Sequence, residues 1–243
     1  MSIEIKNLTK CFDGVKAVNN LSLEFLPGQI TGIIGPNGSG KSTLVNLLTG
    51  VIPFDRGLVL LGSDTKLSKL AAYDVAEYGI TRTFQDARLF EQMTVLDNIL
   101  VVLTERNLFS AFFERHKKFH LDEAEKLLTQ VGLWEKRQAL TANLSYGQRK
   151  LLEVARTLAM KSEIYFFDEP FAGLFSEMIK IVSGVLVELK KTDKTVVLVE
   201  HNMDLIRELS DTVVVLDAGE LLTVGRPEEV LSRKEVVEAY LGE

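Results

Sequence analysis

Nine consecutive residues near the start of the chain combine three glycines, one lysine and three hydroxyl side chains. Glycines let backbone N–H groups close around an anion, because no Cβ stands in the way. The run matches the phosphate-loop pattern, in which the lysine, here Lys41, reaches the β- and γ-phosphates and the next hydroxyl, on Ser42, ligates Mg²⁺. The sequence therefore predicts a site for ATP and Mg²⁺, with Asn37 to Thr43 as binding residues, in the run Gly35-Pro36-Asn37-Gly38-Ser39-Gly40-Lys41-Ser42-Thr43.

Two adjacent carboxylates follow an apolar run later in the chain. Residues 164–167 are all apolar or aromatic, and Asp168 and Glu169 come directly after them. In an open α/β sheet, the carboxyl ends of the strands face the crevice in which ligands bind. A phosphate-loop NTPase needs an acid on a neighbouring strand. We therefore expect Asp168 to hold Mg²⁺, through water, and Glu169 to polarise the attacking water.

A serine begins a long helical pattern in the middle of the chain. Ser145 and Gln148 have the spacing of a capping box, and a well-capped helix start would explain both residues. A second interpretation is that this helix N-terminus presents its dipole and the Ser145 hydroxyl to a phosphate. Because the phosphate loop already has a helix of its own, that phosphate would belong to a nucleotide held by another subunit. The local sequence leaves both interpretations open.

The elements that must position these residues alternate between apolar strands and helices. Three of the strands are too apolar to face water, which is typical of a parallel sheet buried on both faces. A stretch from about 87 to 160 is mostly helical instead, with helices expected at 95–103, at 121–131 and after Ser145. The other expected elements are strands at 31–34, 57–61, 164–167, 195–199 and 212–216 and helices at 42–49, 176–190 and 204–209. We expect one α/β domain over residues 1–243, with a helical subdomain inserted at about 87–160.

The composition of the whole chain excludes several classes of protein. The chain has 243 residues and one cysteine, Cys11, so an internal disulfide is impossible and a reducing compartment is expected. The net charge of -6 argues against a broad basic surface, and hence against a nucleic-acid partner. No apolar run approaches the roughly 18 residues that span a bilayer. We expect a cytoplasmic protein, peripheral to the cell membrane, that contacts the membrane only through a partner.

Taken together, the motifs resemble the ATPase subunits of ABC transporters over essentially the whole chain. The motif Leu144 to Gln148 marks this family among phosphate-loop proteins, so the resemblance favours a phosphate near Ser145. It implies a P-loop NTPase core with a mainly parallel sheet, an N-terminal antiparallel β subdomain and the inserted helical subdomain. The motifs that carry the resemblance are, in chain order, Phe12, Gly35–Thr43, Gln85 in Thr83-Phe84-Gln85, Leu144-Ser145-Tyr146-Gly147-Gln148, Phe167-Asp168-Glu169-Pro170, and His201 in Val199-Glu200-His201-Asn202.

The resemblance also implies roles within one subunit. Phe12 would stack on adenine. Gln85 would sense the γ-phosphate and Mg²⁺, as a further metal contact, and lie near a transmembrane permease subunit. His201 would contact the γ-phosphate and help to orient the water on which Glu169 acts.

The resemblance further implies a second ATPase subunit. Ser145, Gly147 and Gln148 would complete the nucleotide site of that opposite subunit. One residue departs from the family pattern: Phe175 stands where the family has Asp or Asn, and an apolar ring cannot make the hydrogen bonds of that residue. An intact loop in a different partner would compensate, so a homodimer and a heterodimer both remain open. A module that holds ATP but barely cleaves it also remains open.

A narrower likeness concerns the cargo. Residues 79–85, 88–90, 93–95 and the ending 238–243 look like the ATPases that serve branched-chain amino acid importers. Residues 169–174 are also similar to the lipopolysaccharide-export ATPase. The first likeness predicts import of branched-chain amino acids or related small solutes. A lipopolysaccharide-export-type subunit and a non-transport ABC ATPase are the alternatives.

Overall fold

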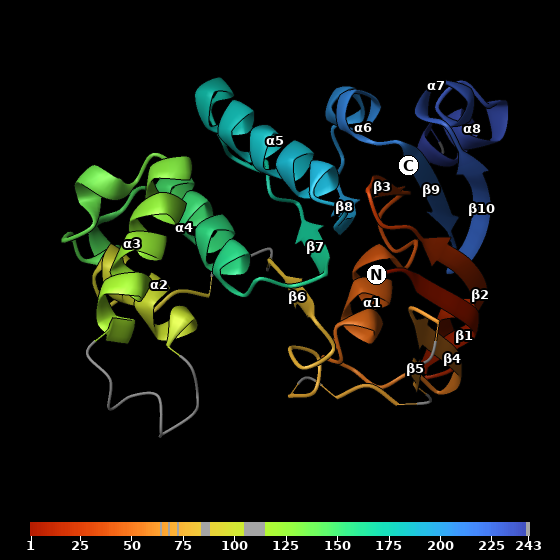
Figure 1. The fold of residues 1–243 in the computed structure, drawn as a ribbon. Helices are drawn as coiled ribbons and strands as arrows, with labels where there is room; N and C mark the ends of the chain where they lie inside the picture. The colour runs from red at the N-terminus through yellow and green to blue at the C-terminus, as the bar shows by residue number, and fades with distance from the viewer. Residues whose placement is uncertain (64, 68, 72, 84–87, 105–114, 242–243) are drawn as a thin grey trace. The chain divides into compact units, whose positions relative to one another are not determined.

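In the computed structural model, the residues group into two units, drawn as a ribbon in Figure 1. The structure describes residues 1–63, 65–67, 69–71, 73–83, 88–104 and 115–241. The α/β unit comprises Met1–Arg82, Ser162–Glu169 and Val185–Glu243, and the helical unit comprises Thr83–Lys161 and Pro170–Gly184.

A six-stranded sheet forms the centre of the α/β unit. Its order is β10-β9-β3-β8-β7-β6, and all neighbours are parallel except β9 and β10. Every residue of β7 and β8 is buried, which confirms that these runs are too apolar to face water. The strands are β3 (Gln29–Ile34), β6 (Ile80–Arg82), β7 (Ile164–Asp168), β8 (Thr195–Val199), β9 (Thr212–Asp217) and β10 (Glu220–Gly225).

Strands from the N-terminal part of the chain form a smaller antiparallel sheet in the same unit. Its order is β2-β1-β4-β5. Phe25 of this sheet meets Phe166 of β7 edge to face, with 6.4 Å between ring centroids, so the two sheets share one apolar core. This sheet is the antiparallel subdomain that the family resemblance implies. The strands are β1 (Ile3–Phe12), β2 (Val15–Phe25), β4 (Arg56–Leu61) and β5 (Thr65–Leu67).

Helices connect the strands of the α/β unit. The predicted helices are found within one or two residues of the expected limits, and two further short helices follow β10 at the C-terminal end (Figure 1). The helices are α1 (Lys41–Leu48), α6 (Met203–Leu209), α7 (Pro227–Val230) and α8 (Lys234–Leu241), together with the second half of α5 (Ser176–Lys191), whose residues 176–184 belong to the helical unit.

The helical unit contains α2 (Val95–Leu103), α3 (Arg115–Gln130) and α4 (Tyr146–Ala159). Its buried Asn98 donates to the backbone oxygens of Phe90 and Thr94 and to Thr141 Oγ1, which ties α2 to the loops around it. Helix α3 begins at Arg115, before the expected residue 121. The sequence does not indicate this earlier start because the first turns of the helix are mostly polar and basic and carry no apolar periodicity. The fold is therefore the expected α/β class with a helical part.

Candidate functional site

The predicted phosphate loop joins β3 to α1, and two of its glycines are required by close backbone contacts. Gly35 has φ of 151°, and a Cβ there would lie 2.1 Å from the Leu216 oxygen of β9. Gly40 has φ of 99°, and a Cβ there would lie 2.3 Å from the Ala17 oxygen of β2. No side chain fits at either position. Backbone oxygens of both sheets, from β9 and β2, therefore constrain the backbone of the loop.

Lys41 is buried inside this loop. Its Nζ donates to the backbone oxygens of Gly35 and Pro36, at 2.7 and 2.9 Å. Ser42 is exposed in the first turn of α1, and a Cβ built on Gly38 would meet nothing within 4 Å, so the loop is open on that side. The buried ammonium and the helix N-terminus fit phosphate oxygens, and the exposed Ser42 hydroxyl fits Mg²⁺.

Asp168 and Glu169 stand at the carboxyl end of β7, as the sequence predicts. Asp168 is buried as the last residue of the strand. Glu169 has φ of 49° and is held there by a bond from its backbone N to the Val199 oxygen at 2.9 Å. A non-glycine residue in the left-handed region is uncommon and costs conformational energy, and such residues concentrate at functional sites.

The structure brings Glu169 together with His201, the second predicted catalytic residue. Glu169 Oε1 and His201 Nε2 are 3.0 Å apart. The two residues follow neighbouring strands, β7 and β8, so the parallel pairing of those strands sets their separation. The Glu169 side chain is partly exposed, which leaves room for a water molecule beside its carboxylate.

Glu200 shapes the turn that presents His201, and the sequence reasoning missed it. This buried carboxylate accepts from the backbone N of His201 and of Asn202, at 3.0 and 3.3 Å. Asn202 in turn caps α6 through its own side chain. A charged residue between an apolar strand and a helix cap is the signal that could have identified this position.

Arg82, at the end of β6, is a second residue that the sequence reasoning missed. Its Nη2 lies 2.9 Å from Asp168 Oδ2, and its Nη1 donates to Asn46 Oδ1 at 2.6 Å and Thr49 Oγ1 at 3.1 Å. Both side chains of the ion pair are at least nine-tenths buried. One guanidinium thus holds the acid of β7 against the helix that follows the phosphate loop.

We expect Arg82→Met to destabilise the protein by about 3–5 kcal/mol, because it leaves the Asp168 carboxylate buried without its cation. Arg207→Met is the matched control, since the Arg207–Asp204 pair is exposed and contributes little. Urea unfolding of the two variants measures the difference. Equal midpoints would contradict a structural role for the buried pair.

Ser145 caps α4, so the predicted capping box is confirmed. Ser145 Oγ accepts from the Gln148 N, and Gln148 Oε1 accepts from the Ser145 N. Ser145 is exposed, with Gly147 in the first turn of the helix, so the hydroxyl and the helix N-terminus also face solvent. The geometry is compatible with both interpretations of this motif.

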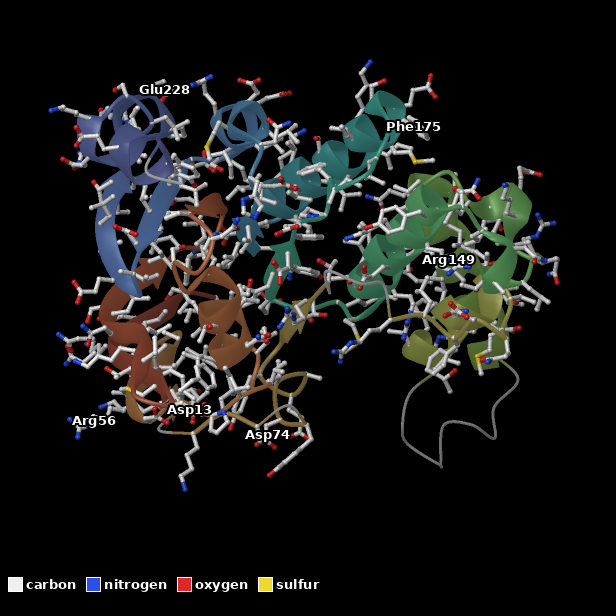
Figure 2. All side chains as sticks on the ribbon, turned by 180° about the vertical axis from the view of Figure 1, so that it is seen from behind. Asp13, Arg56, Asp74, Arg149, Phe175 and Glu228 are labelled. Atoms are coloured by element: carbon white, nitrogen blue, oxygen red, sulfur yellow. The ribbon has the colours of Figure 1, made fainter. Side chains whose placement is uncertain are left out.

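Two aromatic residues, Tyr146 and the Phe175 that departs from the family pattern, lie in the helical unit. Tyr146 packs beside Gly173, where a Cβ would come within 2.9 Å of the ring. Phe175, just before α5, is 79% exposed (Figure 2).

Two further predicted nucleotide contacts have different outcomes. Phe12 ends β1 and is exposed, with Lys10 Nζ 5.3 Å from its ring centroid. Asp55 supports this strand end, and its hydrogen bond from Lys10 lowers the pKa of the Asp55 carboxyl. An exposed ring is available for stacking. Gln85 lies outside the described residues.

Among the described residues, no helix has the length and apolar character needed to cross a membrane.

Comparison with known proteins identifies the family. The ABC transporter family model matches residues 18–172. The chain is 38% identical to the high-affinity branched-chain amino acid transport ATP-binding protein LivG of Escherichia coli, covering 99% of this chain and 98% of that protein. It is 35% identical to the corresponding protein BraF of Pseudomonas aeruginosa, over 99% and 98% of the two chains.

Solved structures agree with this result. An ATP-binding cassette of an ABC transporter in its ADP conformation matches with a TM-score of 0.86 and 33% identity, over the full length of both chains. A dimeric cassette in a post-hydrolysis state, bound to ADP and phosphate, matches with a TM-score of 0.80 and 25% identity, over 93% of this chain and 98% of that chain. The family match, the relatives and the fold together show that this chain belongs to the ABC transporter family of ATP-binding cassettes.

Proposed function

We propose that this chain hydrolyses ATP to power an ABC transporter. The observation that carries the proposal is the combination, within the α/β unit, of buried Lys41 in a phosphate loop with left-handed Glu169 paired to His201. Lys41 supplies the positive charge for the phosphates, and Glu169 lies at the end of a parallel strand, where ligands of such sheets bind.

Each residue has a separate part in the proposed reaction. Lys41 and the N–H groups of the loop would bind the phosphates, and Ser42, with Asp168 acting through water, would hold Mg²⁺. The ion, when bound, neutralises the charge that develops on the transferred phosphoryl group. Glu169 accepts a hydrogen bond from the attacking water and polarises it. His201, held by the turn that Glu200 shapes, orients the Glu169 carboxylate and contacts the γ-phosphate.

A second ATPase subunit completes the proposed site. Ser145, Gly147 and Gln148 would contact the nucleotide that this partner holds, through the N-terminus of α4. The dimeric relative bound to ADP and phosphate supports an assembly of this kind. Phe175 would then meet the partner, and its lack of hydrogen-bonding groups favours a partner that supplies the missing polar contacts.

The transported solute follows from the relatives. Their names specify branched-chain amino acid transport, and their likeness covers nearly all of this chain. We propose that the chain binds permease subunits on the cytoplasmic face of the membrane, and that ATP hydrolysis drives import of branched-chain amino acids. ABC cassettes of other transporters share the fold, so the assignment of the solute rests on sequence likeness alone.

Uptake of radiolabelled leucine tests this function. Cells that lack this chain are expected to lose high-affinity uptake, and the wild-type chain to restore it. A chain with Glu169→Gln is expected to restore none, because turnover is needed for transport. Normal leucine uptake in cells without the chain, in the absence of another such importer, would contradict the proposed solute.

A further inference from the structure

We propose that Tyr240, on the C-terminal helix α8, is a positioning residue for the phosphate loop. Its hydroxyl accepts a hydrogen bond from the backbone N of Gly35, the first glycine of the loop, at 2.5 Å. The two residues are separated by 205 positions in the chain. The inference deepens the proposed nucleotide site and rests on it.

The hydrogen bond to Tyr240 holds the N–H side of Gly35, whose carbonyl oxygen is already held by Lys41. The Gly35 oxygen accepts from Lys41 Nζ at 2.7 Å, while the Gly35 N–H donates to Tyr240. Gly35 is buried and lies against the Leu216 oxygen of β9. Both peptide groups around this glycine are therefore oriented by side chains, and one of those side chains is the lysine that would bind the phosphates.

Helix α8 is itself anchored, so it can hold Tyr240 in place. Val236, one turn before Tyr240, is buried at 3% exposure. Arg233, just ahead of the helix, donates to Thr223 Oγ1 of β10. Strand β10 pairs with β9, and β9 pairs with β3, the strand that ends at the phosphate loop. Figure 1 shows α7 and α8 beside β10 in the C-terminal part of the α/β unit.

This arrangement would prepare the loop for phosphates before a nucleotide binds. Without the Tyr240 hydroxyl, the Gly35 peptide can rotate, and the Lys41 ammonium loses a fixed acceptor. Part of the binding free energy would then be spent on reordering the loop. Tyr240 does not touch the reacting atoms in this account. Its loss should therefore weaken ATP and ADP binding alike and raise KM, with little change in kcat.

Tyr240→Phe tests the inference, because it removes one oxygen and keeps the ring. The control is Tyr73→Phe, since Tyr73 is 79% exposed in the described part of the same unit. Titration calorimetry with ADP is expected to give a Kd about three- to tenfold higher for Tyr240→Phe, the factor that one neutral hydrogen bond supplies. Tyr73→Phe should match the wild type, and kcat should be similar in all three proteins.

Two results separate the inference from the function on which it rests. A folded Tyr240→Phe protein that binds ADP as tightly as the wild type would overturn the role of Tyr240. A lower unfolding temperature with unchanged ADP affinity would also overturn it, since the residue would then serve stability only. A wild-type protein that fails to bind ADP would overturn the proposed nucleotide site itself.

Discussion

Lys41→Met is expected to lower kcat/KM for ATP by about 10²–10³-fold, the range seen when one preorganised group is removed from the place where charge develops. Methionine has a similar length but no charge, so the side chain can fill the loop without binding phosphate. The substitution also removes the hydrogen bonds that the Lys41 ammonium donates to the backbone oxygens of Gly35 and Pro36. Equilibrium titration with ATP measures the loss of affinity, and a steady-state phosphate-release assay measures the loss of turnover.

The control for this substitution is Lys16→Met, at a lysine exposed near the start of β2. It changes the net charge equally and is expected to keep full activity. If Lys41→Met bound and cleaved ATP as the control does, the loop would not be the phosphate site.

Glu169→Gln is expected to bind ATP normally and to lower kcat by about 10²–10⁴-fold, the usual contribution of a general base. The amide keeps the size of the side chain, so the contact with His201 and the left-handed turn can persist. It has no carboxylate to accept a proton or to polarise water. Phosphate release under saturating ATP, together with a binding titration, separates the lost turnover from retained affinity.

Glu163→Gln provides the matched comparison. Glu163 immediately precedes β7 and pairs with Lys194 at the surface, 2.5 Å away, so the same chemical change is made at the other end of the strand. It is expected to hydrolyse ATP at the wild-type rate. If the two variants hydrolysed ATP at comparable rates, the proposed catalytic role of Glu169 would be contradicted.

Much of this site could be predicted because its residues lie at the ends of strongly patterned elements. The apolar runs of β3, β7 and β8 identify buried strands, and in a parallel sheet their carboxyl ends meet at one edge. Glu169 and His201 follow two of these strands, so their approach is a consequence of strand pairing. The capping box of Ser145 is local in the sequence and was equally predictable.

Two of the residues that were missed, Arg82 and Tyr240, act through long-range polar contacts, whereas Glu200 accepts hydrogen bonds from the backbone of the next two residues. Arg82 reaches an acid 86 positions away, and Tyr240 reaches a glycine 205 positions away. An arginine at a strand end and a tyrosine in a short helix have no periodic pattern that would reveal their partners. Their roles depend on which strands become neighbours, and β9 and β10 return the C-terminal part of the chain to the phosphate loop only once the sheet has formed.

Sedimentation velocity of Glu169→Gln with Mg²⁺ and ATP tests most directly whether two subunits share each nucleotide. We predict that ATP converts the variant from monomer to a lasting dimer, because bound ATP joins the two subunits and is not cleaved. Adding Ser145→Arg should abolish the shift while ATP still binds to the phosphate loop. A wild-type chain that sediments as a monomer with ATP while it hydrolyses ATP at full rate would contradict the shared site.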